Sequence, residues 1–122
     1  MDIEILPFEE SLIPYAVKVF KLLSESSSIL DKVEKDMNRK SFHLVLKLMK
    51  DEKLRNLLVA VRDRIELPNK ISKIRKMLSL ADKKNFAYVI ILGEDEAKNN
   101  LITVKNLDTA DQFQLPLSLF EG

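Results

Sequence analysis

Hydrophobic and polar residues alternate in two short stretches of the chain, and each stretch ends at a proline. The first covers residues 2–8 and is interrupted at Pro7, and the second covers residues 64–67 and is followed by Pro68. Alternation with a period of two is typical of a half-buried strand, and proline cannot donate to a strand ladder. The pattern therefore predicts a short strand near the N-terminus and another in the middle of the chain.

Between these strands, apolar residues recur at spacings of three and four, as in amphipathic helices. The first such stretch covers about residues 9–23, where Pro14 is acceptable only in the first helical turn. The polar residues 24–28 predict a break. Helical spacing then resumes in three further stretches, at residues 29–37, 42–50 and 51–63. Within the last of these, the run from Leu57 to Val61 also fits a buried strand, because periodicity does not separate the two for so short a run.

The second half of the chain has the pattern of an α/β fold. Apolar spacing predicts a helix over about residues 70–84, and a continuous apolar run follows at residues 86–92 and stops at Gly93. A continuous run is typical of a central strand that is covered on both faces. Asn99-Asn100 suits a tight turn, because asparagine tolerates positive φ. Two more strands are predicted at residues 101–105 and 112–115.

This order of elements predicts an α/β fold with a mixed, mostly parallel sheet of about five strands and helices packed on it. The last strands are expected to pair antiparallel, because the links between them are too short for crossovers. The chain has 122 residues, which suits a single domain. We therefore expect residues 1–122 to form one domain, with an extra helical insertion at about residues 25–63.

Composition narrows the functional classes. The chain has no cysteine and one histidine, which argues against disulfides, thiol chemistry and a His-rich metal site, and we expect no cofactor and no metal. No glycine-rich phosphate loop is present. There is no signal-peptide pattern, and no apolar stretch approaches the roughly 18–20 residues of a membrane span. These features predict a cytoplasmic protein without a membrane partner.

Several residues that can carry chemistry are more simply explained by structure. His43 has no partner in any motif, and the acidic run from Glu94 to Glu96 is expected to be a polar turn rather than a magnesium site. Tyr15 and Tyr88 fit either the core or a base-stacking role. Four phenylalanines are expected in the core rather than as stacking platforms, namely Phe8, Phe20, Phe86 and Phe113.

Positive charge is concentrated in one segment although the net charge of the chain is only +1. The predicted helix at residues 70–84 and its ends carry Lys70, Lys73, Arg75, Lys76, Lys83 and Lys84. Such a helix either contacts phosphates or is the solvated side of an amphipathic helix.

Three segments in the second half form an ordered series, at residues 81–84, 88–96 and 103–112. The series resembles the end of the anticodon-binding domain of class II aminoacyl-tRNA synthetases, and the part from Lys105 to Gln112 is similar to the histidyl branch in particular. The resemblance extends over about residues 3–24 and 64–120. Where the family usually has glycine, this chain has Asn99-Asn100 in the hairpin turn and Ala110 after Thr109.

The resemblance implies that Asn69, Glu96 and Lys105 contact anticodon bases, with Gln112 as a further candidate. Amides, carboxylates and lysines suit this role because they pair with base edges and phosphates, and exposed single-stranded bases are the usual target of specific RNA recognition. If the strands pair as predicted, the first three residues should approach one another at one end or face of the sheet. In the basic segment, the candidates for phosphate contacts are Lys70, Lys73 and Lys76.

Two functions remain open from the sequence. The resemblance implies a tRNA anticodon-binding domain of a histidyl-tRNA-synthetase-like protein, which positions tRNA for ATP-dependent aminoacylation by a catalytic domain that this chain has no room for. Its partners would then be the anticodon stem-loop, a catalytic synthetase domain and a homodimer mate. The alternative is a freestanding interaction, dimerisation or regulatory module, using an apolar face formed by Leu44, Leu48, Leu54, Leu57, Leu58 and Val61. By itself the chain lacks a catalytic constellation, although the parent protein is expected to be a histidine-tRNA ligase.

Overall fold

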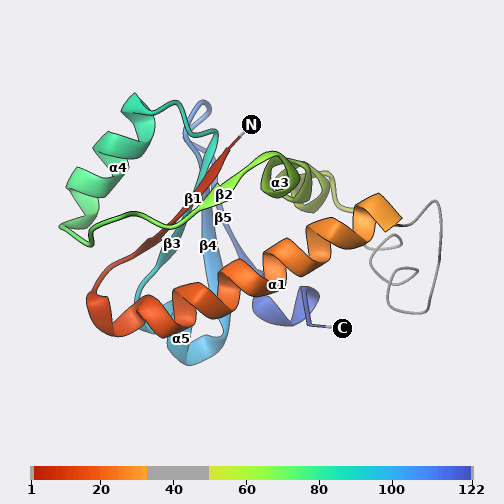
Figure 1. Ribbon diagram of the computed structural model, residues 1–122, viewed down its shortest axis with the longest axis horizontal. Coiled ribbons are helices and arrows are strands. Elements are labelled where there is room, and N and C mark those ends of the chain that lie inside the picture. The colour runs from red at the N-terminus through yellow and green to blue at the C-terminus, as the bar shows by residue number, and fades with distance from the viewer. Residues whose placement is uncertain (1, 33–49, 122) are drawn as a thin grey trace.

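A five-stranded mixed sheet forms the centre of the molecule, with the strand order β2-β1-β3-β4-β5 (Figure 1). The computed structural model describes residues 2–32 and 50–121. The strands are β1 (Ile3–Pro7), β2 (Ile65–Glu66), β3 (Tyr88–Leu92), β4 (Leu101–Asn106) and β5 (Gln112–Pro116). The helices are α1 (Ile13–Lys32), α3 (Glu52–Asp63), α4 (Ile74–Lys83) and α5 (Glu94–Asn99), with short 3₁₀ turns η1 (Glu10–Leu12) and η2 (Leu117–Leu119).

The direction of pairing changes across the sheet. Strand β1 pairs in parallel with β2 on one side and with β3 on the other, whereas β3 and β4, and β4 and β5, pair antiparallel. The predicted α/β class and mixed sheet are therefore confirmed, as is the antiparallel pairing of the last strands. The C-terminal ends of β1, β2 and β3 consequently lie at the same end of the sheet.

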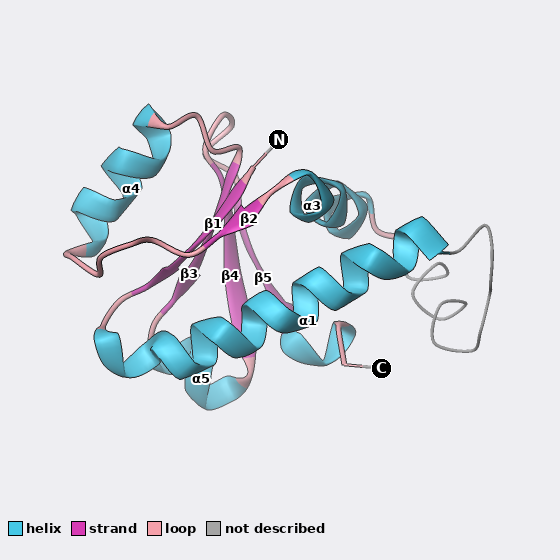
Figure 2. Ribbon diagram, in the orientation of Figure 1, coloured by secondary structure: helices cyan, strands magenta, loops and turns pink. Residues whose placement is uncertain are grey.

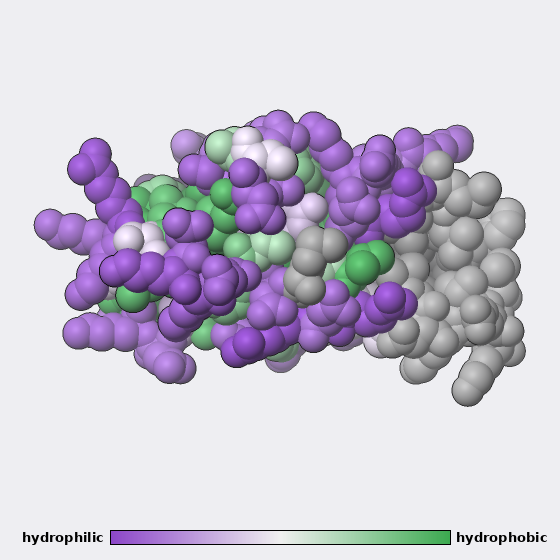
Figure 3. All heavy atoms as spheres, turned by 90° about the horizontal axis from the view of Figure 1, so that it is seen from above, coloured by the Kyte–Doolittle hydropathy of each residue, from purple (hydrophilic) through white to green (hydrophobic). Residues whose placement is uncertain are grey.

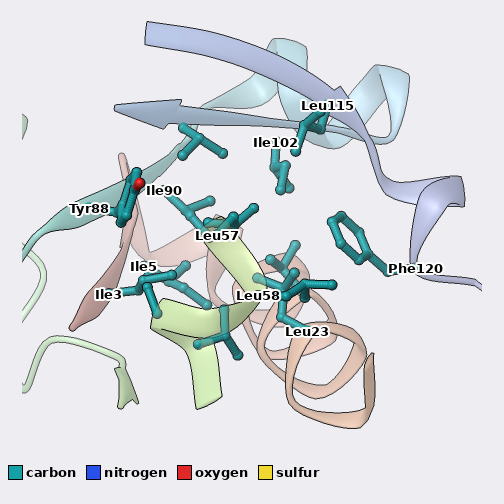
Figure 4. Packing of buried hydrophobic residues seen from close by; sticks show 14 of the residues in the cluster. Ile3, Ile5, Leu23, Leu57, Leu58, Tyr88, Ile90, Ile102, Leu115 and Phe120 are labelled. Atoms are coloured by element: carbon teal, nitrogen blue, oxygen red, sulfur yellow. The ribbon is translucent and has the colours of Figure 1, made fainter. Parts of the chain in front are cut away.

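Helices cover both faces of the sheet (Figure 2). Alternate strand residues such as Ile5 and Ile90 point to one face, where they pack against α1 and α3 in the larger apolar cluster (Figure 4). Leu6 and Val89 point to the other face and pack against α4 in a second cluster. Because β3 contributes to both clusters, its continuous apolar run is explained by burial on both faces, as predicted.

The predicted break at residues 24–28 is wrong, because α1 continues through it to Lys32. The serine hydroxyls bond to the helix itself: Ser27 Oγ donates to the Ser24 carbonyl at 3.0 Å and Ser28 Oγ donates to the Glu25 carbonyl at 2.9 Å. Such back-bonding lets serine remain inside a helix. Pro14 lies in the first turn of α1, as required.

The helical alternative is correct for the run that includes Leu57 and Leu58, because α3 spans it. Asp51 caps this helix by accepting a hydrogen bond from the Leu54 backbone at 3.2 Å. Leu54, Leu57, Leu58 and Val61 are all buried in the larger cluster. These four residues therefore belong to the core of the chain itself and form no partner-binding face. Two members of that proposed face, Leu44 and Leu48, lie outside the described residues, as do His43 and residues 33–49 of the predicted helical stretches.

Two elements differ from their predicted extent in the second half. Helix α4 begins at Ile74 rather than near residue 70, so Lys70 and Lys73 precede it; the intervening chain instead packs Ile71 against the second cluster. Helix α5 occupies a segment for which only a turn was expected. Acidic residues in its first turn complement the helix dipole, and Asn100 ends it with a φ of 53°.

Candidate functional site

One face of the β4–β5 pair is polar, and no helix within residues 2–32 and 50–121 covers it. Ile102, Val104 and Leu115 point into the larger cluster, so their neighbours along the strands point the other way. Helix α4 packs over β1 and β3 on that side, and the second cluster contains no residue of β4 or β5. The residues at this surface, together with one from α5, are Glu96, Thr103, Lys105, Gln112 and Gln114, and we call them the β4–β5 polar surface.

A chain of hydrogen bonds fixes one end of this surface. Gln114 Nε2 donates to Thr103 Oγ1 at 3.2 Å, and the same hydroxyl donates to Glu96 Oε1 at 3.3 Å. Thr103 is 5% exposed, whereas Gln114 is exposed and Glu96 is half-buried. The buried hydroxyl therefore holds a carboxylate and an amide at the surface, where both retain capacity for further hydrogen bonds.

Lys105 and Gln112 lie next to this chain on the same surface. They are cross-strand partners in the β4–β5 ladder, and Thr103 and Gln114 form the next pair on the same face. Residues two apart on a strand are separated by roughly 7 Å, a distance that one nucleotide can bridge. The structure thus brings together three of the predicted site residues: Glu96, Lys105 and Gln112.

Asn69 does not join them. It follows β2, the edge strand farthest from β5, and two strands separate β2 from β4. At a strand spacing of about 4.8 Å, β2 and β4 lie roughly 14 Å apart. Asn69 instead lines a separate cavity of about 740 Å³ with Glu4 and Lys84. The expected approach of Asn69 to Glu96 and Lys105 fails because the strand order, which the sequence does not specify, places β2 outside β1.

An exposed aromatic ring lies close to the polar surface. Phe8 follows β1 and is 41% exposed, so its predicted place in the core is wrong. With Gly93 and Glu96 it lines a cavity of about 480 Å³ at the C-terminal ends of β1 and β3. Gly93 leaves room for the ring, since a β-carbon there would lie 2.9 Å from Phe8 Cδ2. The other three phenylalanines are buried or half-buried, as expected.

Tyr15 fastens α1 to the start of β4. Its hydroxyl donates a hydrogen bond of 2.7 Å to the Leu101 carbonyl. Burial, reinforced by the negative charges of Glu96 and Glu121, raises the pKa of the Tyr15 hydroxyl to about 12. The hydrogen bond joins α1 to the strand that carries Thr103 and Lys105.

Residues 69–84 carry six lysines and arginines against one aspartate, a local net charge of +5, whereas the whole chain carries +1. The predicted phosphate contacts Lys70, Lys73 and Lys76 are exposed, and within the described residues none of them has an ion-pair partner. Only Lys76 lies on α4, because the other two precede the helix. Hydrophilic side chains project from the end of the molecule at which α4 lies (Figure 3).

Two further kinds of feature are absent from the part of the chain that the structure covers. Residues 2–32 and 50–121 contain no group of three or more His, Cys, Asp or Glu side chains placed to hold a metal ion. None of the helices in these two ranges is both long and apolar enough to cross a membrane. Fold and site together define a small α/β binding domain with an open polar sheet face.

The chain belongs to the Anticodon binding domain family, whose model matches residues 2–121. It is 42% identical over 45 residues to the histidine–tRNA ligase of Aquifex aeolicus, covering 37% of this chain and 11% of that protein. It is 33% identical over 86 residues to the histidine–tRNA ligase of Clostridioides difficile, covering 70% of this chain and 18% of that protein. The predicted resemblance is therefore confirmed, and the chain matches only a small part of each relative's length.

Solved structures support the same fold. Histidyl-tRNA synthetase from Nostoc sp. PCC 7120 superposes with a TM-score of 0.61 at 17% identity, covering 98% of this chain and 20% of that one. The RNA binding domain of threonyl-tRNA synthetase from Cryptosporidium parvum Iowa II superposes with a TM-score of 0.57 at 15% identity, covering 96% of this chain and 21% of that one. At these identities the likeness concerns the fold alone.

Proposed function

We propose that this chain binds the anticodon stem-loop of a tRNA through the β4–β5 polar surface. The observation that carries the proposal is the clustering of Glu96, Lys105 and Gln112 on one uncovered sheet face, within a fold of the Anticodon binding domain family. Specific RNA recognition favours unstacked bases whose edges meet polar side chains. An open sheet face offers such bases both a platform and hydrogen-bonding partners.

Each residue of the surface has a role that its chemistry suits. Glu96 accepts hydrogen bonds from a base amino group, and its orientation is set by Thr103. Gln112 contributes both a donor and an acceptor, and Lys105 binds a phosphate or a base carbonyl oxygen. The exposed ring of Phe8, in a cavity that Glu96 also lines, provides a stacking partner for one base.

The basic segment binds the RNA backbone in this proposal. Lys70, Lys73 and Lys76 are exposed and contact phosphates without reading the sequence. Asn69 lies beside these lysines rather than beside Glu96, so we expect it to contact the RNA backbone rather than a base. Cations at one end of the domain and base-reading groups on the sheet face together orient the stem-loop.

The relatives that the chain matches are histidine–tRNA ligases, of which it spans 11% and 18% in the two cases above. We therefore propose that residues 1–122 act as one tRNA-binding domain for a cytoplasmic, histidyl-tRNA-synthetase-like protein. A separate catalytic domain would carry out the ATP-dependent aminoacylation, and this domain would position the tRNA for it. The catalytic domain and a homodimer mate are the expected protein partners.

Titration of the chain with a labelled histidine anticodon stem-loop at low and high salt tests this function. The proposal predicts saturable binding that weakens as salt rises, with a log–log slope of about −0.7 to −0.9 for each phosphate contact. Absence of saturable binding at low salt would overturn it. A stem-loop of the same length with a poly-uridine loop serves as the reference for non-specific binding.

A further inference from the structure

A mostly buried glutamate on β1 has a carboxyl group without a protein partner. Glu4 is 4% exposed and points to the α4 side of the sheet, since its neighbours Ile3 and Ile5 point into the larger cluster. Within the described residues, its carboxyl group makes no hydrogen bond and no ion pair. No fully buried side-chain oxygen in these residues lacks a hydrogen-bond partner, so the carboxyl oxygens of Glu4 remain accessible to solvent in an adjoining cavity. Partial desolvation disfavours the charged form of a carboxyl group, and a bound cation would offset that cost. Glu4 is therefore a candidate for contact with something outside the chain.

The carboxyl group opens into the cavity of about 740 Å³ at the β2 edge of the sheet. A volume between about 300 and 1,000 Å³ is typical of sites for small molecules. Phe20 and Phe86 supply aromatic wall, and Asn69 contributes an amide. The cavity thus combines apolar surface with a few polar groups, as small-molecule sites usually do.

Among the charged groups that line the cavity, Arg64 and Glu66 are already paired with each other. Arg64 also forms an ion pair with Asp2, and its guanidinium lies 5.9 Å from the centre of the Phe86 ring. Glu4 and Lys84 are the remaining charged residues of the cavity, and neither has an ion-pair partner within the described residues. The positive charge of Lys84 lowers the pKa of Glu4, but burial and Glu66 raise it by more, and no ion pair joins Glu4 to Lys84. One acid and one base therefore face the same cavity without forming an ion pair with each other.

We propose that this cavity binds a small zwitterion of the amino-acid type. Its ammonium group would donate to the Glu4 carboxylate, its carboxylate would meet Lys84, and its side chain would pack against Phe20 and Phe86. Such a ligand neutralises both charges at once, whereas a simple amine or a simple acid leaves one of them uncompensated. The site lies at the edge of the sheet opposite β5, so it is separate from the β4–β5 polar surface. It adjoins the basic segment, because Asn69 and Lys84 both line the cavity.

The test is a titration of the whole 122-residue chain with each common amino acid, followed by ¹⁵N–¹H NMR. The proposal predicts saturable shifts for at least one amino acid, centred on residues 4, 64–69 and 84–86. Decarboxylated and deaminated analogues of the best amino acid separate the two charges, and each should bind roughly tenfold or more weakly because it carries only one of the two charged groups. Absence of saturable shifts for every amino acid would overturn the proposal.

Two variants and a control locate the site. Glu4→Gln keeps the size of the side chain but removes its charge, and Lys84→Met removes the cation; each should weaken binding by roughly tenfold or more. Lys98→Met, on the exposed side of α5, should leave binding unchanged. Equal affinity in Glu4→Gln and the unchanged chain, with both folded by NMR, would contradict the assignment. Equal affinity for the amino acid and its decarboxylated analogue would contradict the zwitterionic ligand.

Discussion

The ring of Phe8 lies directly against Gly93, too close to leave room for a β-carbon on that glycine. The built β-carbon is 2.9 Å from Phe8 Cδ2 and 3.2 Å from Cε2. The φ of Gly93 is −109°, which other residues adopt readily, so the need for glycine is steric rather than conformational. This contact joins the ends of two adjacent strands, β1 and β3, beside the polar surface.

Gly93→Ala should therefore destabilise the chain by about 1–3 kcal/mol, because the added methyl group forces the Phe8 ring to move. Urea denaturation gives the free energy of unfolding. In a Phe8→Ala background the same substitution should cost much less, since the obstructing ring is gone. An equal loss with and without Phe8 would show that the two residues are not coupled.

Ala110 is one of the positions at which the chain departs from the family's usual glycine, and its φ is 62°. The left-handed region costs a residue with a β-carbon about 1–2 kcal/mol, whereas glycine costs roughly 0.5–1 kcal/mol through the greater entropy of the unfolded chain. Ala110→Gly should accordingly raise the free energy of unfolding by up to about 1 kcal/mol. Ala97→Gly, inside α5, is the matched control and should lower it by about 1 kcal/mol. Destabilisation by Ala110→Gly would contradict this account.

The stability of the chain should depend on pH through Glu4. Burial, more than the repulsion from Glu66, raises the pKa of Glu4, and Lys84 opposes the rise only in part; Arg64 also lines the cavity. A raised pKa means that the folded chain binds the proton more tightly than the unfolded chain. The stabilisation is thus complete below the unfolded-chain pKa of about 4.3, and it is lost as the pH rises through the folded value.

Glu4→Gln removes this titration. The variant should gain stability over the unchanged chain as the pH rises from about 4 to about 8, because ionised Glu4 is then partly desolvated and repelled by Glu66. Unfolding in urea at a series of pH values measures the difference. A difference that stays constant across the series would contradict the raised pKa.

Salt dependence should report on the basic segment. Replacing Lys70, Lys73 and Lys76 together by alanine should weaken stem-loop binding and reduce the log–log salt slope by about 0.7–0.9 for each phosphate that the chain no longer neutralises. Lys18, Lys21 and Lys98, also exposed, give a control with the same change in charge. A slope that falls equally in both triple variants would assign the effect to net charge rather than to this segment.

Much of the fold is predictable because it follows from local patterns. The alternation of hydrophobic and polar residues before Pro7 and the continuous apolar run of β3 correctly predicted strands. The short connections between the last strands correctly predicted antiparallel pairing and therefore a mixed sheet. The polar residues 24–28 were wrongly predicted to break the helix. Their serine hydroxyls donate hydrogen bonds to carbonyl groups of the helix itself, so the helix continues through them. Helix α5 was missed because six mostly polar residues have no apolar periodicity to detect.

The site was only partly predictable, because it depends on strand order. Lys105 and Gln112 face each other across two consecutive antiparallel strands, a relationship that a short connection specifies. The position of Asn69 depends on β2 lying outside β1, which no local pattern encodes. The exposure of Phe8 depends likewise on packing against Gly93, a residue 85 positions away in the numbered sequence.

The most direct test of the central claim compares Glu96→Gln with the unchanged chain on two stem-loops, one with the histidine anticodon and one with a swapped anticodon. Loss of the carboxylate should cost about 1–3 kcal/mol of binding free energy with the histidine anticodon and almost none with the swapped one. Glu25→Gln, at an exposed position of α1 away from this surface, should change neither. Equal losses on both stem-loops, or no loss on either, would contradict anticodon reading by the β4–β5 polar surface.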